Sequence, residues 1–365
     1  MTGGGWGPPA PTPAATRSPD DGRRSVIRRA FTLVELLVVV GIIGVLVALL
    51  LPALRTVVDR ARAVATTNTM RNFAKACDAY RAQFGDLPGA IPDPYLYQGD
   101  GDTYVPVLSG AQNALLGLMG GFRTPGDADY ASYQGTEHTI AAPGQPPFRI
   151  KIDGNAMGEG PVRDGRRHDA FLTPGAKEWN RSSGRVGSTA GVNPNLPDLI
   201  DAWGQPIIFL KRIRAIGPLV NRPGRPGQFT RTGLLPYTLS ASLAELAQCQ
   251  TVADPKRFSV LNTESAGGRS GAEARDLTLG QLIRHAGTGT NAATGASSDL
   301  ERIWSGTARG DYFVMSAGPD GIYFSAAQGN GSASAPQGDI VSATANPDGP
   351  RVLERFDDIV IAGGG

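Results

Sequence analysis

The stretch that decides the fold is "FTLVELLVVVGIIGVLVALLLPALR", residues 31 to 55. From Phe31 to Leu51 it contains 21 residues, and Glu35 is the only charged one. At 1.5 Å per residue, a helix of this length crosses a hydrocarbon core of about 30 Å. A carboxylate held at that depth costs roughly 2.5 to 3.5 kcal/mol. Glu35 therefore predicts a functional partner for its charge.

Basic residues stand in front of this apolar segment. Arg23, Arg24, Arg28 and Arg29 precede it, which places the N-terminus in the cytoplasm by the positive-inside tendency. Residues 1 to 22 are rich in Pro, Gly, Ala and Thr, a composition typical of disorder. The apolar run is longer than the core of a secretory signal and continues directly into a helical pattern. We therefore expect a retained membrane span over residues 31–52.

The helix is expected to continue beyond the span. Pro52 should bend it without ending it, because helical periodicity resumes at once. Gly85 supplies a C-terminal cap, and Pro88 prevents continuation. One helix from Thr32 to Phe84 is predicted, with residues 53–85 as its extracytoplasmic part. Its apolar stripe has alternating spacings of three and four and consists of Met70, Phe73, Cys77, Tyr80 and Phe84.

The remainder, residues 86–365, predicts an α+β globular domain in which the long helix packs on a small antiparallel sheet. Its many glycines and prolines indicate large loop-rich insertions. The segment 205–213 gives the strongest strand signal, because it is β-branched and aromatic. Strands are predicted at 148–152, 205–213, 311–318 and 356–363, short helices at 112–119, 240–250 and 276–286, and a flexible loop at 287–298.

Composition excludes several classes of function. The formal net charge is only +2, and the basic residues after residue 30 form no aromatic-rich stripe, so nucleic acid is not expected as a partner. Two cysteines, Cys77 and Cys249, exclude a four-cysteine zinc site. One bridge between them is left open, while the apolar helical position of Cys77 favours simple burial. His138, His168 and His285 are too far apart to form a spaced metal-ligand pair.

Catalytic motifs are absent from the sequence. It contains no G-x-S-x-G elbow, no H-E-x-x-H and no G-x-x-x-x-G-K phosphate loop. Glu137 and His138 are adjacent and could act as an acid and base, but in a turn-rich segment such a pair is more often solvated surface. A membrane-anchored periplasmic enzyme is therefore the least favoured function.

The segment from Arg28 to Leu54 resembles the cleavage and methylation motif of type IV prepilins and type II secretion pseudopilins. The resemblance implies that a prepilin peptidase cuts between Ala30 and Phe31 and methylates the new amine. It also implies that Glu35 pairs with the ammonium of Phe31 in a neighbouring subunit, where a low dielectric makes the pairing strong. The family usually has Gly where Ala30 stands. Because its leaders are short, we expect translation to begin at Val26.

Further segments are similar to the major pseudopilin of type II secretion. That protein is much smaller, so the resemblance implies insertions at about 90–200 and 215–305. Trp203 and Gly204 also have a structural interpretation that needs no family. The Trp203 ring is expected to cover the small sheet, and Gly204 permits a tight turn. The similar segments are "AKACDAYRAQFGDLPG" (74–89), "DAWGQPIIF" (201–209), "SAGPDG" (316–321) and "FDDIV" (356–360).

The same resemblance implies one bound calcium ion, held by carboxylates and backbone carbonyls near the C-terminus. Calcium takes six to eight oxygen ligands and could stabilise a closing loop. The alternative is that these acids serve as turn residues and surface charge. "GDGD" (99–102) is a rival calcium loop that lacks the rest of an EF-hand. The implied ligands are Asp320, Asp357 and Asp358, with carbonyls from residues 316–319 and Asp339 as a substitute for one carboxylate.

Together these features predict a structural subunit, a pseudopilin that assembles through its N-terminal helix into a type II secretion pseudopilus. Its expected partners are further copies and other pseudopilins in a helical fibre, the prepilin peptidase, the inner-membrane platform of the secretion system and membrane lipid. Its expected location is the bacterial inner membrane, with a cytoplasmic N-terminus and a periplasmic globular domain that can be extracted into the fibre. The alternative is a type IV pilin of a surface pilus for adhesion or motility.

Overall fold

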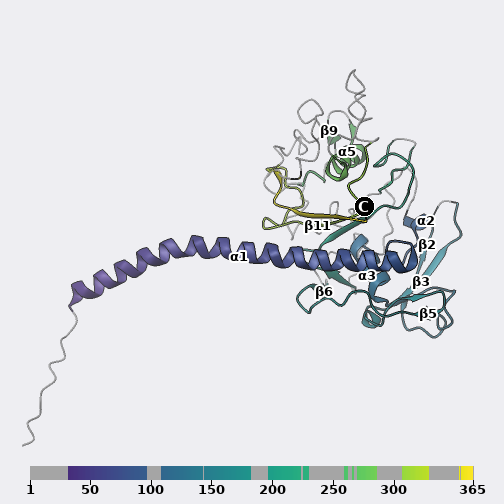
Figure 1. Ribbon diagram of the computed structural model, residues 1–365, viewed down its shortest axis with the longest axis horizontal. Coiled ribbons are helices and arrows are strands. Elements are labelled where there is room, and N and C mark those ends of the chain that lie inside the picture. The colour runs from purple at the N-terminus through teal and green to yellow at the C-terminus, as the bar shows by residue number, and fades with distance from the viewer. Residues whose placement is uncertain are drawn as a thin grey trace, which may run out of the picture. The chain divides into compact units, whose positions relative to one another are not determined.

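A computed structural model divides the chain into two compact units, residues 1–55 and 56–365 (Figure 1). The structure describes residues 32–96, 108–142, 144–181, 196–222, 225–229, 259–261, 265–266, 269–285, 306–328, 353 and 355–364. Ala30, Phe31, Cys249 and Asp339 lie outside these residues. The same holds for the predicted helix 240–250, the loop 287–298 and the rival calcium loop 99–102.

Helix α1 (Leu33–Phe84) is a single element of 52 residues, which confirms the long N-terminal helix (Figure 1). Pro52 lies inside it and does not end it, while a bend at this position stays a prediction. The helix ends at Gly85, which has a φ of +81° and donates its N–H to the carbonyl of Arg81 at 2.7 Å. A positive φ is strained for any residue with a Cβ, so glycine suits this cap.

The other described elements belong to the second unit. The helices are α2 (Asp93–Leu96), α3 (Gly110–Met119), the 3₁₀ helix η1 (Gly154–Ala156) and α5 (Gly271–Ile283). The strands are β1 (Phe122–Arg123), β2 (Thr136–Ile140), β3 (Phe148–Ile152), β4 (Val162–Arg163), β5 (Arg166–Arg167), β6 (Trp179–Arg181), β7 (Pro197–Leu199), β8 (Ile208–Lys211), β9 (Ser265–Ala266), β10 (Arg269–Ser270), β11 (Tyr312–Ser316) and β12 (Ile359–Gly363).

The main sheet has the order β12-β11-β8, and both pairings are antiparallel. In the central strand, Val314 lies opposite Ile361 of β12 and Phe209 of β8. All three strands fall within segments predicted from their β-branched and aromatic residues. The α+β architecture with a small antiparallel sheet is thereby confirmed.

Helix α1 packs on one face of this sheet. Phe73 meets Phe209 edge-on, with ring centroids 5.3 Å apart. Cys77 is free and fully buried in the same cluster, and burial raises the pKa of its thiol well above the usual range. The predicted apolar stripe is confirmed, because four of its five members are at most 2% exposed: Met70, Phe73, Cys77 and Tyr80.

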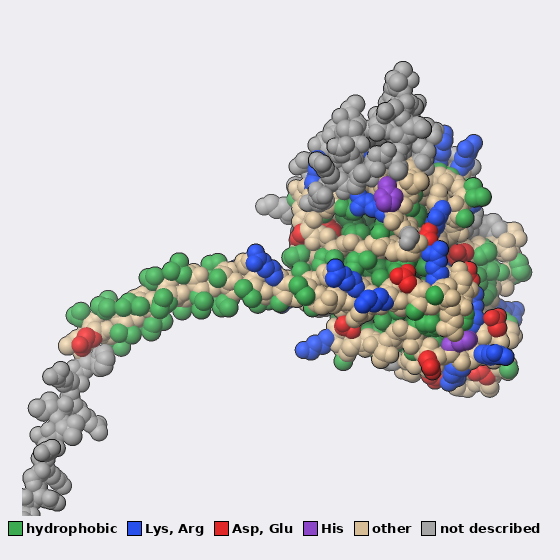
Figure 2. Space-filling view, in the orientation of Figure 1, with side chains coloured by type: hydrophobic (Ala, Val, Ile, Leu, Met, Phe, Trp, Pro, Cys, Tyr) green, Lys and Arg blue, Asp and Glu red, His purple; other side chains and the backbone are tan. Residues whose placement is uncertain are grey.

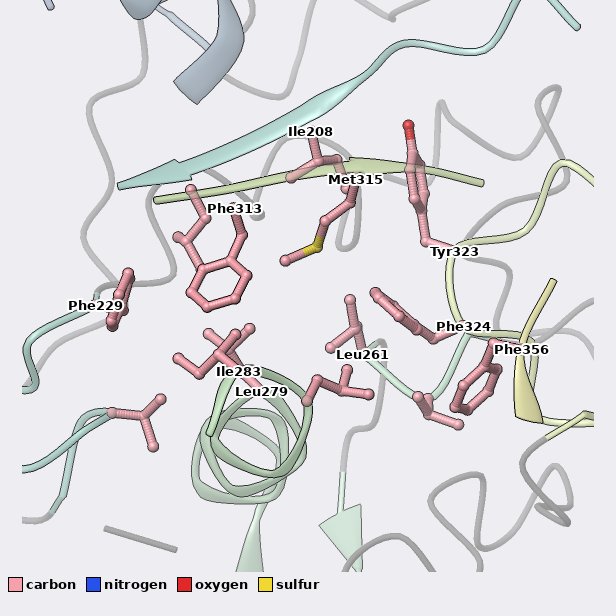
Figure 3. Packing of buried hydrophobic residues seen from close by; sticks show 14 of the residues in the cluster. Ile208, Phe229, Leu261, Leu279, Ile283, Phe313, Met315, Tyr323, Phe324 and Phe356 are labelled. Atoms are coloured by element: carbon pink, nitrogen blue, oxygen red, sulfur yellow. The ribbon is translucent and has the colours of Figure 1, made fainter. Parts of the chain in front are cut away.

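A second core fills the other face of the sheet. Side chains alternate across a strand, so Phe313 and Met315 point away from the face that Tyr312 and Val314 present to α1. They pack with residues of α5, including Ile283 (Figure 3). The predicted helix at 276–286 is therefore real, although it begins at Gly271 and ends at Ile283.

The segment between residues 90 and 200 contains more regular structure than its sequence indicates. Strand β3 was expected, but β1 and β2 pair with it on either side to form the sheet β1-β3-β2. The sequence of β2, "TEHTI", ends in its only fully buried residue, Ile140. Its signal is weak because a strand with one fully buried position shows little apolar alternation.

A charged cluster that the sequence does not reveal joins α1 to the ends of the main-sheet strands. Asp311 accepts from Arg81 at 2.6 Å and from Arg212 at 2.9 Å. Arg81 also donates to the carbonyl of Gly364 at 3.0 Å. Desolvation raises the pKa of Asp311, but the two guanidiniums outweigh it and hold that pKa below its usual range.

Candidate functional site

The first candidate site is the start of α1, where Glu35 closes a capping box with Thr32. The Glu35 carboxylate accepts from the Thr32 N–H at 2.9 Å and from the Thr32 hydroxyl at 3.0 Å. In return, the Glu35 N–H donates to the Thr32 hydroxyl at 3.2 Å. Thr-x-x-Glu at a helix start is the usual sequence signature of this motif. Within a single chain, the acid therefore has a local polar partner.

This local partner is an addition to the sequence interpretation, which sought a partner only in a neighbouring subunit. Thr32 stands three residues before Glu35, so the box could have been found from the sequence. Cleavage between Ala30 and Phe31 would place the new ammonium one residue before Thr32. The intersubunit ion pair stays a prediction, since Phe31 lies outside the described residues.

The first half of α1 is an exposed apolar surface. Its side chains from Leu33 to Leu54 are all exposed, for example Leu33 at 77% and Leu49 at 71%. Figure 2 shows this half of the helix as almost continuous hydrophobic surface. This half of the helix is long and apolar enough to cross a membrane, by length and composition. An apolar surface of this size indicates an interaction site with lipid or with other helices.

The second candidate site is the turn at Asp201, which ties α1 to the main sheet. The Asp201 carboxylate accepts from the N–H groups of Trp203 and Gln205 at 2.9 and 2.8 Å, and from the Ser316 hydroxyl at 2.7 Å. Thr66 of α1 accepts from the Ala202 N–H at 3.0 Å. Burial raises the pKa of Asp201, although these hydrogen bonds oppose the shift.

Asp201 organises this turn, a role that the sequence interpretation did not assign to any residue. Gly204 has a φ of +85°, so the tight turn needs glycine as expected. The Trp203 Nε1 is buried without a hydrogen-bond partner. That the Trp203 ring covers the sheet stays a prediction. The role of Asp201 could have been predicted from the sequence, because an Asp at the start of a turn commonly accepts a hydrogen bond from the backbone N–H two residues later.

The third candidate site contains the implied calcium ligands Asp320, Asp357 and Asp358. Both oxygens of Asp358 accept from the Phe324 N–H at 3.0 Å. Asp320 accepts from the Ile322 N–H at 2.8 Å. Gly318, with a φ of +66°, lies so close to the Asp357 carbonyl that a Cβ at residue 318 would collide with it. The 316–321 loop and the closing acids are thus neighbours.

The electrostatics of Asp320 and Asp358 disfavour their charged forms. Desolvation raises the pKa of Asp320 to about 6, and the nearby charge of Asp357 adds to the shift. Desolvation also raises the pKa of Asp358 well above its usual range, with further contributions from Asp320 and Asp357. A cation would relieve this repulsion, and carboxylate oxygens are donors that Ca²⁺ prefers.

The carboxylates alone do not make a metal centre. Among the residues that the structure describes, no group of three or more His, Cys, Asp or Glu side chains could hold a metal ion. The donor chemistry fits calcium, but the ion would need backbone carbonyls as well. Asp339, named as a substitute ligand, lies outside the described residues.

Glu137 and His138 are not arranged as an acid and base pair. They are consecutive residues of β2, so their side chains point to opposite faces of the sheet. Desolvation lowers the pKa of His138, and its Nε2 is buried without a partner. His168 lies elsewhere, with its Nδ1 3.0 Å from the Gln83 amide.

Comparisons with known proteins agree with the geometry of α1. Residues 27–51 match a family described as the prokaryotic N-terminal methylation motif. The chain is also similar to the type IV major fimbrial protein FimA of Dichelobacter nodosus. These two matches make the N-terminal part of the chain similar to type IV pilins. Identity to FimA is 29% over 163 residues, which cover 43% of this chain and 83% of the fimbrial protein. No solved structure matches the chain.

The similarity to pilin-like proteins covers only part of the chain. The methylation motif accounts for the start of α1, and similarity to the fimbrial protein extends over less than half of the chain. Pilin-like subunits are structural and polymerise into fibres, which agrees with the expected self-assembly. The exposed apolar helix near the start agrees with membrane anchoring.

Proposed function

We propose that this chain is a structural subunit of a type II secretion pseudopilus, made as a precursor and assembled through α1. The observation that carries the proposal is the change of environment along this helix. Its first half is apolar and exposed, whereas one face of its second half is buried against the main sheet. A free apolar half suits lipid before assembly and neighbouring helices in a fibre afterwards.

In this proposal a prepilin peptidase cuts between Ala30 and Phe31, and the new amine of Phe31 is methylated. The ammonium of one subunit then meets the Glu35 carboxylate of its neighbour and sets their axial offset. The subunit sits in the bacterial inner membrane with its globular domain in the periplasm. Its partners are other pseudopilins, the peptidase and the inner-membrane platform.

A surface pilus subunit for adhesion or motility is the second candidate. One specific observation favours it, because the similar curated protein is a fimbrial protein and its match covers 83% of that protein's length. The two functions share the physics of α1 and differ in where the fibre lies. Labelled antibody against the globular domain, applied to intact cells, separates a surface fibre from a periplasmic one.

The first test of the proposal is the N-terminal residue of the protein purified from membranes. We expect mass spectrometry to find a methylated Phe31 at the N-terminus, and the uncut precursor in a strain without the peptidase. A purified protein that still begins upstream of Phe31 contradicts the proposal. The mass of the precursor also tests the expected start at Val26, because a precursor with residues 1–25 excludes it.

We propose further that calcium binds at Asp320, Asp357 and Asp358 together with carbonyls of the 316–319 turn, with Asp339 as a substitute ligand. Calcium at about 100 times its Kd would stabilise the fold by about 2.7 kcal/mol and raise Tm by several degrees. The measurement is thermal unfolding of the full chain in detergent, with calcium and with a chelator. An unchanged transition removes the metal from the proposal.

The calcium effect should depend on pH in a direction set by Asp320. The pKa of Asp320 is raised to about 6 in the folded state, so without calcium the folded protein favours the protonated carboxyl. The stability that this carboxyl contributes is complete below about pH 4 and is lost as pH rises through 6. Because this carboxylate is partly exposed and screened by solvent, the free energy of unfolding falls by about 1 kcal/mol over this range. We expect a larger calcium effect at pH 7.5 than at pH 5. Asp320→Asn should reduce it, while Asp164→Asn in the exposed β4–β5 turn should not.

A further inference from the structure

A group of arginines follows directly after the apolar half of α1. Arg55, Arg60 and Arg62 lie within eight residues, and Asp59 is the only acid among them, so three positive charges against one negative leave a net charge of +2. All three arginines are exposed. Among the described residues, no acceptor of the protein receives a hydrogen bond or ion pair from them. Their charge is therefore available to an outside partner.

The placement of these arginines matches the headgroup layer of a membrane. From Arg55 to Arg62 the helix advances about 10 Å, beginning at the residue after the apolar segment ends. The polar region on each side of a bilayer is about 6 Å deep, and arginine side chains extend toward it from either direction. Figure 2 shows blue side chains beginning where the continuous hydrophobic surface of the helix ends.

The distribution around the helix favours lipid over a single docked protein. Arg60 and Arg62 are two residues apart, which is about 200° around the helix axis, so they point to nearly opposite sides. Headgroups surround a helix at the membrane surface and can meet both side chains. One docked acidic protein contacts one face of a helix and meets only one of them.

The proposed cleavage changes which end of the span carries the positive charge. Before cleavage, residues 1–30 hold five arginines against two aspartates, a net charge of +3. Cleavage after Ala30 removes all five and leaves only the new amine of Phe31 on that side. The arginines beyond residue 54 are untouched. In the processed subunit they form the larger positive group beside the span.

We propose that Arg55, Arg60 and Arg62 bind anionic phospholipid headgroups of the outer leaflet and hold the processed subunit at the membrane before assembly. The inference rests on the proposed anchoring and cleavage. Basic side chains next to a span attract anionic lipids within about 10 Å, and salt weakens the attraction. Binding to headgroups would keep the apolar half of α1 in register with the bilayer until the fibre takes up the subunit.

The test is lipid selectivity around the full processed chain, reconstituted in phosphatidylcholine vesicles that contain spin-labelled lipid. We expect spin-labelled phosphatidylglycerol to associate about threefold more strongly than spin-labelled phosphatidylcholine at low salt. The triple variant Arg55→Gln, Arg60→Gln, Arg62→Gln should reduce this ratio to about one. Salt at about 1 M should do the same for the unmodified chain.

The matched control is the double variant Arg71→Gln, Lys75→Gln, which removes exposed charges of the same helix at least 13 Å further along. It should retain the selectivity. The proposal is overturned if the triple variant keeps its preference, or if the control loses it equally. A triple variant that keeps its lipid preference but no longer binds other copies would assign the arginines to a protein contact instead. If the lipid test fails, cleavage before Phe31 can still be tested separately by mass spectrometry, so the two proposals can fail independently.

Discussion

Replacing Glu35 by leucine is expected to reduce fibre assembly at least tenfold while leaving the subunit inserted and cleaved. Leucine suits the apolar segment, so insertion should not suffer. The neighbouring Phe31 ammonium would lose its counter-ion in a low-dielectric surrounding, and an unpaired buried charge costs about 3 to 5 kcal/mol. Fibre yield after shearing or cross-linking measures the loss, and the N-terminal residue checks processing.

A second variant, Glu35→Gln, separates the two bonds that Glu35 can make. Glutamine can close a capping box with Thr32 because its side-chain oxygen also accepts from N–H groups. It carries no charge and cannot pair with an ammonium. If the ion pair is required, both variants fail to assemble. Normal assembly of Glu35→Gln alone would assign the effect to the helix cap, and normal assembly of Glu35→Leu contradicts the ion-pair mechanism.

Replacing Phe73 by alanine is expected to destabilise the globular unit by about 3 to 5 kcal/mol, because it removes a large buried side chain. Phe73 is fully buried and contacts Phe209 of β8 edge-on. This contact joins α1 to the main sheet, so its loss weakens the attachment between the two. Urea unfolding of the full chain in detergent, followed by tryptophan fluorescence, measures the change.

The matched control for Phe73→Ala is Val64→Ala in the same helix. Val64 is 61% exposed, and a truncation there should change the free energy of unfolding by less than about 0.5 kcal/mol. If Phe73→Ala costs less than about 1 kcal/mol, this interface does not hold the helix on the sheet. Equal costs for both variants would lead to the same conclusion.

Most of the architecture could be predicted because its signals are local. The period of the apolar stripe, Gly85 and Pro88 define the end of α1 within a few residues. Strands β8, β11 and β12 are β-branched and aromatic over consecutive positions, so they stand out from their surroundings. Strand β2 was missed because a half-exposed strand with polar residues resembles a loop.

The sites were predictable only in part, because their contacts join distant positions. Asp311 bonds to Arg81 across 230 residues and to Arg212 across 99. No local pattern marks such a pairing. Asp320 and Asp358 were predicted as calcium ligands through a resemblance, and the calcium site stays a prediction. The Thr32–Glu35 box, in contrast, is a local motif that the spacing Thr-x-x-Glu indicates.

The central strand β11 has a consequence for how this protein can change during evolution. Tyr312 and Val314 belong to the cluster that contains α1, whereas Phe313 and Met315 belong to the cluster that contains α5. One backbone thus contributes side chains to both clusters. Mutations in the α5 cluster that persist must therefore preserve the shape of this strand, or the surface on which α1 packs is lost with it.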